Sequence, residues 1–233
     1  MHLLREGGEY LANRLRQERN KLLVIAAGGL FSSLSLSVFV HPAAGISGAL
    51  LAAVWTRRSF RDYAAVQKGL RGERLVTDRL GQLPSDFLVI NDILLPNHNG
   101  NIDHVVIGPC GVVVIETKHY RGSLKIFRDH WYQNGHERRS ASKQANRGAI
   151  ALREFLSARH PDLKGSVLSF IETIVVLVDP LSHAEIHSPT TTIVRYSQIL
   201  DVILEKARRR HVSPSVTRRL AHTLATVVPQ TRS

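Results

Sequence analysis

The 233-residue sequence has a single cysteine, Cys110, and this scarcity excludes two classes of small scaffold. One cysteine cannot form an intrachain disulfide, and it cannot supply the paired thiolates of a cysteine-based zinc motif. The 12 histidines form no HExxH motif, which excludes the zincin type of metalloprotease. A lone cysteine also suits a reducing compartment.

Acidic residues are scarce as well. The 19 Asp and Glu face 31 Lys and Arg, which gives a formal net charge of +12 at pH 7. A field of this sign favours polyanionic partners, meaning nucleic acid or anionic lipid headgroups, although a soluble protein with a basic surface has the same balance. The length and the hydrophobic fraction of 43% are those of one packed domain with an accessory segment.

Charge is missing altogether between Leu22 and Trp55, where no Asp, Glu, Lys or Arg occurs. The first arm, Leu22–Val40, has 19 residues, close to the roughly 20 that a helix needs to cross a bilayer. The second arm, Ala43–Trp55, has 13 residues, and His41-Pro42 separates the two arms. Because proline cannot continue a helical hydrogen-bond ladder, the pattern predicts a helical hairpin in the membrane, either spanning or re-entrant.

Basic residues flank this uncharged segment on both sides. Four precede it and three follow it: Arg14, Arg16, Arg19 and Lys21, then Arg57, Arg58 and Arg61. Because positively charged flanks stay on the cytoplasmic side, we expect both ends of the hairpin and the rest of the chain in the cytoplasm. A signal peptide is one alternative, but its lead would have 21 residues and carry three glutamates. A soluble helix pair is another, since the segment's small residues also suit close helix packing.

The remainder of the chain alternates between helical periodicity and β-branched runs. We expect helices over 57–82, 140–158, 197–209 and 214–227, and strands over 87–90, 102–107, 112–117, 123–127, 130–132, 173–178 and 190–195. This order predicts an α/β core with a mixed sheet. The expected division is an N-terminal cytoplasmic helix (1–21), the membrane hairpin (22–56) and an α/β domain (57–233).

Three polar residues lie where two buried strands begin or end. The connector Gly108-Pro109-Cys110-Gly111 predicts an antiparallel turn between the strands, so Asp103 at the start of one lies beside the end of the other. Side chains alternate along a strand, so Glu116 and Lys118 share one face of the second strand. The same alternation turns His104 and His119 away from these neighbours, and we interpret both histidines as structural.

Such a cluster suits the hydrolysis of a phosphodiester. Two carboxylates can hold Mg²⁺ or Mn²⁺ through oxygen ligands, and a bound metal acidifies water and stabilises charge on phosphate. The lysine could position or deprotonate the attacking water, or it could neutralise developing charge.

The stretch from Gly69 to Gln144 resembles the nuclease-related domain, or NERD, of the PD-(D/E)xK nuclease superfamily. The residues that carry the resemblance are Gly69-Leu70-Arg71-Gly72-Glu73, Asn91-Asp92, Leu95-Pro96, Gly100 to Pro109, Gly111 to Lys118, Gly122, Trp131 and Gln144. The resemblance implies a restriction-endonuclease-like core at about 69–180, with a mixed sheet flanked by helices.

The resemblance also implies roles for particular residues. Asp103 and Glu116 match the metal-binding acids, and Lys118 matches the catalytic lysine. Glu73 matches the additional acid that many members supply from the preceding helix, and Gln144 falls where relatives place a helix glutamine near the site. The sequence departs from the superfamily pattern at Ile102, which stands in place of the nominal proline. Trp131 is expected in the core rather than as a platform for a base.

A basic segment follows this motif. From Lys118 to Arg153 there are nine Lys or Arg against two acids, and four cluster near the start of a predicted helix: Arg138, Arg139, Lys143 and Arg147. They could bind a phosphate backbone without regard to sequence, or they could be a solvated face. A second basic run, Lys206 to Arg210, could touch DNA or an anionic leaflet.

Two functions fit these observations. The first is a membrane-tethered, Mg²⁺-dependent nuclease whose substrate is DNA and whose catalytic domain lies on the cytoplasmic side. The alternative is a catalytically inactive nucleic-acid-binding or membrane-associated module with a nuclease-like fold. An intact set of Asp103, Glu116 and Lys118 favours the first.

Overall fold

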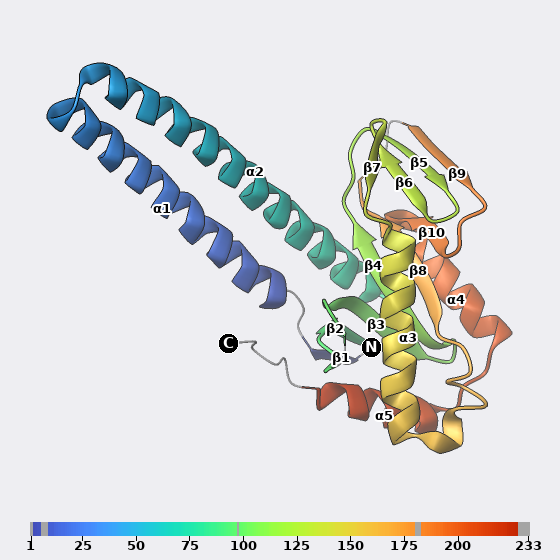
Figure 1. The fold of residues 1–233 in the computed structure, drawn as a ribbon. Helices are drawn as coiled ribbons and strands as arrows, with labels where there is room; N and C mark the ends of the chain where they lie inside the picture. Colours follow the sequence, from blue (N-terminus) through green and yellow to red (C-terminus); the bar gives the residue numbers. More distant parts are fainter. Residues whose placement is uncertain (1, 6–8, 97, 180–182, 228–233) are drawn as a thin grey trace. The chain divides into compact units, whose positions relative to one another are not determined.

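A computed structural model describes residues 2–5, 9–96, 98–179 and 183–227 (Figure 1). The chain divides into two compact units. One spans Glu9–Arg71, and the other comprises the strand β1 (His2–Arg5) together with Gly72 and the described residues that follow it. The division falls inside helix α2, which runs from Pro42 to Leu80.

The unit Glu9–Arg71 consists of helix α1 (Glu9–Phe39) and the first part of α2. The break at Val40-His41 lies where the sequence predicts it. The helices run antiparallel and side by side: the hydroxyl of Ser33 donates to the carbonyl of Gly45 at 2.9 Å. A Cβ atom added at Gly29 would collide with Ala52 of α2. Small residues therefore allow the two backbones to approach closely.

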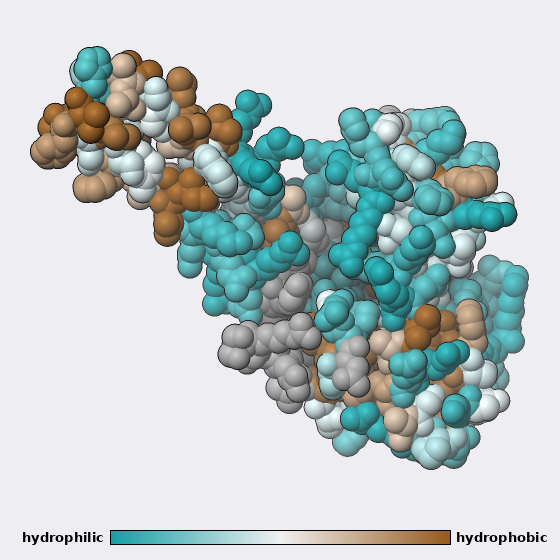
Figure 2. Space-filling view, viewed as in Figure 1, coloured by the Kyte–Doolittle hydropathy of each residue, from teal (hydrophilic) through white to brown (hydrophobic). Residues whose placement is uncertain are grey.

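Large apolar side chains of this unit are exposed. They include Leu30 at 74%, Phe31 at 75% and Phe39 at 84% exposure. Figure 2 shows apolar side chains gathered around the turn between α1 and α2. Among the described helices, α1 alone is long and apolar enough to cross a membrane, over Ala12–Phe39.

The second unit is built on a mixed six-stranded sheet in the order β1-β2-β3-β4-β8-β10. Its strands after β1 are β2 (Leu88–Ile93), β3 (Ile102–Gly108), β4 (Gly111–Lys118), β8 (Glu172–Leu177) and β10 (Thr192–Arg195). Strand β3 is antiparallel to both β2 and β4, whereas β4, β8 and β10 are parallel. The mixed sheet agrees with the sequence prediction, and β8 pairs with a strand on each side. Strand β1, which pairs in parallel with β2, lies in a segment where a helix was expected.

Helices cover both faces of this sheet. Helices α3 (Ala141–Arg159) and α5 (Pro214–Ala225) pack on one face, and α4 (Ile199–Arg209) with the last turns of α2 packs on the other. Each face of the sheet forms a hydrophobic cluster with the helices that cover it. Because side chains alternate along β4, Val112 and Val114 pack in the cluster with α3 and α5, whereas Val113 and Ile115 pack in the cluster with α4 and α2. Two short 3-10 helices, η1 (Pro161–Leu163) and η2 (Tyr196–Gln198), complete the connections.

A second sheet, in the order β7-β6-β5-β9, was not foreseen as a separate element. It comprises β5 (Ser123–Phe127), β6 (His130–Gln133), β7 (His136–Arg138) and β9 (His183–His187). Strand β6 carries Trp131, which is fully buried and donates its indole N–H to the Ser142 hydroxyl at 3.1 Å. The prediction that Trp131 belongs to the core is confirmed.

Candidate active site

Asp103 and Glu116 meet at one end of the six-stranded sheet. The antiparallel pairing of β3 with β4 puts the first residues of β3 beside the last residues of β4. Both carboxyl groups are buried, with Asp103 5% and Glu116 3% exposed, and the charge of Glu116 is close enough to raise the pKa of Asp103. The backbone N–H of Thr117 donates to Oδ2 of Asp103 at 2.8 Å and fixes its orientation.

Lys118 joins these acids to helix α3. Its Nζ donates to Oε1 of Glu116 at 2.6 Å and to Oε1 of Gln144 at 3.2 Å. Gln144 lies in the first turns of α3, whose start is capped by the Ser140 hydroxyl accepting from the backbone N–H of Lys143 at 3.2 Å. The structure thus brings Asp103, Glu116, Lys118 and Gln144 together.

Glu73 faces the same cluster from the last part of α2. Its side chain is partly buried, and burial is the main cause that raises its pKa to about 10. The negative charges of Asp103 and Asp92 add to this effect. Glu73 therefore lies near Asp103, Glu116 and Lys118, within the range at which their charges affect its pKa.

Asp92 is a fourth carboxylate that the sequence analysis left without a role. It is 2% exposed, and its Oδ1 accepts a hydrogen bond from the Asn101 side chain at 3.1 Å. Its backbone has a φ of 55°, a left-handed conformation that Asp tolerates better than most residues. The available signal was the polar pair Asn91-Asp92 within the strand Leu88–Ile93, whose other residues are apolar.

Burial and the charges of neighbouring groups shift the pKa values of Asp103, Glu116 and Lys118. Burial raises the pKa of Asp103 well above its usual value, and the charge of Glu116 raises it further. Burial also raises the pKa of Glu116, against the opposing pull of Lys118. For Lys118, burial would lower the pKa, but Glu116 and Asp103 outweigh burial and raise it. The site therefore concentrates more negative charge than one lysine can neutralise, an arrangement that favours binding of a cation.

The donor set fits Mg²⁺ or Mn²⁺ through Asp103 and Glu116. No group of three or more His, Cys, Asp or Glu among the described residues is placed to hold a metal ion. Mg²⁺ typically binds one or two carboxylates and keeps water or substrate phosphate oxygens as its other ligands. Buried, hydrogen-bonded carboxylates meet that requirement.

His104 lies on the opposite side of the sheet from these acids. Its ring nitrogens contact Oδ1 of Asn91 at 2.7 Å and the Thr117 hydroxyl at 3.0 Å. Burial lowers the pKa of His104 to about 3, so the ring stays neutral at physiological pH. His119, which contacts Oδ1 of Asp179 at 2.6 Å, also points away, as strand alternation predicts.

The predicted nucleic-acid-binding residues Arg138, Arg139, Lys143 and Arg147 are all exposed. Arg139 is near enough to Glu116 to lower the pKa of that carboxyl. The second basic run is engaged elsewhere: Lys206 forms an ion pair with Glu172 at 2.8 Å, and Arg210 donates to the Val167 carbonyl at 3.0 Å. The first cluster therefore borders the acids, whereas part of the second holds the fold together.

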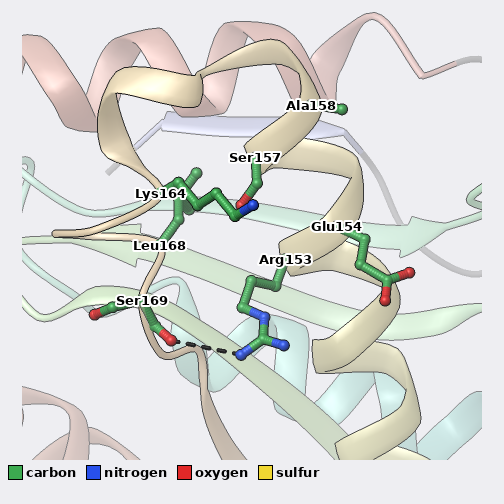
Figure 3. A pocket seen from close by; sticks show the side chains of 7 residues that line it. All are labelled: Arg153, Glu154, Ser157, Ala158, Lys164, Leu168 and Ser169. Carbon is green, nitrogen blue, oxygen red and sulfur yellow. Dashed lines mark hydrogen bonds between the residues drawn. The ribbon is translucent and has the colours of Figure 1, made fainter.

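A cavity of about 680 Å³ lies away from this chemistry. Its lining, shown in Figure 3, comes from the second half of α3 and the segment after η1: Arg153, Glu154, Ser157, Ala158, Lys164, Leu168 and Ser169. Arg153 donates across it to the Ser169 carbonyl at 3.5 Å. None of the acids of the sheet lines this cavity, so the cavity does not serve the reaction assigned to them.

Comparisons with known proteins agree with this geometry. Residues 68–178 match the family model described as the nuclease-related domain. An uncharacterized protein of Bacillus anthracis is 41% identical over 59 residues, which cover 24% of this chain and 28% of that protein. No solved structure matches the chain. The matched segment contains Glu73, Asp103, Glu116, Lys118 and Gln144, so all five residues of the site lie within the part of this protein that is similar to the nuclease-related domain.

Proposed function

We propose that this protein is a metal-dependent nuclease that hydrolyses phosphodiester bonds in DNA and is tethered to a membrane by residues 22–55. The observation that carries the catalytic part is the position of the Lys118 ammonium. It lies within hydrogen-bonding distance of both Glu116 and Gln144, beside a second buried carboxylate, Asp103. A phosphate that reached this point would meet a fixed cation and two metal-binding acids.

Each residue of the site has a separate task. Asp103 and Glu116 would hold Mg²⁺, which when bound acidifies water and stabilises charge on phosphate. Lys118, whose pKa is raised by Glu116 and Asp103, would neutralise negative charge on the phosphate. Gln144 orients the lysine, and the Thr117 N–H orients Asp103. Glu73 lies beside these acids and, with its pKa raised to about 10, carries a proton at neutral pH in the absence of metal.

The substrate is proposed to be DNA held through its backbone. Arg138, Arg139, Lys143 and Arg147 are exposed near the start of α3, and Arg139 lies close to Glu116. Contacts of this kind bind phosphates irrespective of base sequence and weaken steeply with salt. A DNA strand lying along this segment would have its backbone beside the acids.

The membrane tether is supported by the exposed apolar surface of the helix pair. Leu30, Phe31 and Phe39 are each more than 70% exposed. Soluble proteins rarely expose a continuous apolar surface of this kind to water, so it marks a site of contact with a membrane or a partner. Basic residues on both flanks favour a hairpin with both ends, and the catalytic domain, on the cytoplasmic side.

The test incubates full-length protein in detergent with supercoiled plasmid, linear duplex, single-stranded DNA and RNA, in Mg²⁺, Mn²⁺ or EDTA. We expect cleavage of DNA with Mg²⁺ or Mn²⁺ and none in EDTA. Glu116→Gln should abolish cleavage, because a neutral amide holds a divalent metal poorly. Glu154→Gln, an exposed glutamate of α3, is the matched control and should cleave at the wild-type rate. DNA binding in Ca²⁺ without cleavage in any metal would replace the nuclease by the inactive module.

A further inference from the structure

A cleft opens between α1 and α2 just outside the uncharged segment. It has a volume of about 450 Å³ and lies entirely within the unit Glu9–Arg71. Its lining residues are Arg14, Glu18, Lys21 and Ile25 from α1, and Trp55, Arg58, Ser59, Asp62, Ala65 and Val66 from α2. The four residues of α1 lie three or four positions apart, and so do Trp55, Ser59, Asp62 and Val66 of α2, with Arg58 and Ala65 beside them, so each set forms one stripe along its helix.

Three cations line this cleft. Arg14, Lys21 and Arg58 come from different turns of two helices, and Lys21 is held by Glu18 at 2.9 Å. Asp62 is the other acid of the lining, which leaves one positive charge in excess. The exposed residues around the cleft add further positive charge through Arg16, Arg19, Arg57 and Arg61.

The apolar surface begins where the cleft ends. Leu23 and Val24 of α1 are 60% and 71% exposed, and Val54 and Trp55 of α2 are 67% and 58% exposed. Trp55 therefore stands at the border between the charged lining and the apolar stretch. Tryptophan is enriched at this level of membrane proteins, where one part of the ring meets hydrocarbon and the other meets headgroups.

We propose that this cleft binds the headgroup of an anionic phospholipid, whose phosphate is held by Arg14 and Arg58. Glu18 and Asp62 accept hydrogen bonds from the headgroup hydroxyls, and the acyl chains lie along the exposed apolar residues beyond Trp55. The excess of cations selects anionic over zwitterionic lipid. The inference rests on the proposed membrane insertion, which it makes specific for one lipid class.

The test is flotation of full-length protein with vesicles of phosphatidylcholine alone or with phosphatidylglycerol added. The cleft variant is Arg14→Gln with Arg58→Gln. The matched control is Arg16→Gln with Arg57→Gln, which removes the same charge from exposed positions outside the cleft. The measurement is repeated in ~0.5 M salt, where the Debye length of a few ångströms screens diffuse attraction between exposed charges.

We expect wild type and control to prefer the phosphatidylglycerol vesicles in high salt, and the cleft variant to lose about tenfold of that preference. All three should still float with phosphatidylcholine alone, because insertion depends on the apolar arms. An equal loss of this preference in the two variants would mean that the basic residues on both helices attract anionic lipid collectively, and it would overturn the proposed binding of a headgroup in the cleft.

Two further outcomes also overturn the proposal. If millimolar inorganic phosphate abolished the preference for phosphatidylglycerol vesicles, the cleft would bind free phosphate instead of lipid. Loss of DNA retention, but not of lipid preference, in the cleft variant would assign the cleft to nucleic acid. Failure of the wild type to float with either vesicle would instead refute the membrane tether itself.

Discussion

Replacing Glu73 with glutamine should stabilise the protein in the absence of metal. Burial and the neighbouring acids raise the pKa of this carboxyl from 4.5 to about 10. The folded state therefore binds the proton more tightly than the unfolded state does. The contribution of the Glu73 carboxyl to the free energy of unfolding is fully present below about pH 4.5 and is lost as the pH rises toward 10. Glutamine keeps the size of the side chain and removes the charge that causes this loss.

The magnitude follows from the size of the shift. At pH 8 the interval above the unfolded pKa is 3.5 units, and at about 1.4 kcal/mol per unit the full effect would be about 5 kcal/mol. Solvent reaches part of the Glu73 side chain and screens its repulsion, so we expect Glu73→Gln to stabilise by about 2 kcal/mol. In a chain of this length that corresponds to a rise in Tm of about 4–8 °C.

The assay is thermal unfolding of full-length protein in detergent and EDTA, from pH 5 to pH 9. The gain in Tm should be small at pH 5 and grow with pH. Glu154→Gln, on the exposed side of α3, should leave Tm unchanged across the range. A loss of Tm in Glu73→Gln at pH 8, or a gain that does not depend on pH, would show that Glu73 is not held against the other acids.

Three other predictions concern the lysine, the DNA contacts and the topology. Lys118→Ala should reduce cleavage by about 10²–10³-fold while Mn²⁺ binding, measured by titration calorimetry, stays near wild type; a parallel loss of metal binding would assign the lysine a structural role. Arg139→Gln with Lys143→Gln should weaken DNA binding in Ca²⁺ and reduce the salt slope by about 1.8, and an unchanged slope would place DNA elsewhere. Cysteine introduced at residue 233, with Cys110 replaced by serine, should be labelled only after cells are opened; labelling of intact cells would refute the cytoplasmic placement.

The sequence was informative where the pattern was local. A Gly-Pro connector between two β-branched runs fixed the pairing of β3 with β4, and strand alternation then placed Asp103, Glu116 and Lys118 together. The break near His41-Pro42 followed from the backbone chemistry of proline. The change from uncharged to charged residues after Trp55 led us to separate the second apolar arm from the helix predicted over 57–82. The structure shows one helix, α2, because no proline interrupts Ala43–Leu80.

Other features depend on pairing between distant segments. Strand β1 joins the sheet edge through parallel pairing with β2, which residues 2–5 alone could not indicate. Strands β7 and β9 are short and largely exposed, so they lack the apolar alternation that identifies a strand. Asp92 was missed for a related reason: its place beside Glu73 and Asp103 depends on the β2–β3 register and on its left-handed backbone.

The position of β1 also determines which protein to assay. A fragment that begins after the apolar segment would lack β1 and leave the edge of β2 unpaired. An exposed strand edge favours association with other chains. Full-length protein is therefore the material for the tests of activity.

The most direct test of the nuclease assignment is the cleavage of plasmid DNA by Asp103→Asn. Asp103 is buried beside Glu116 and oriented by the Thr117 N–H, and asparagine preserves its shape while removing the charge that would hold the metal. With Mg²⁺ present, we predict that wild type cuts, that Asp103→Asn does not, and that both bind DNA equally in Ca²⁺. Cleavage by Asp103→Asn at the wild-type rate would contradict the assignment of this site.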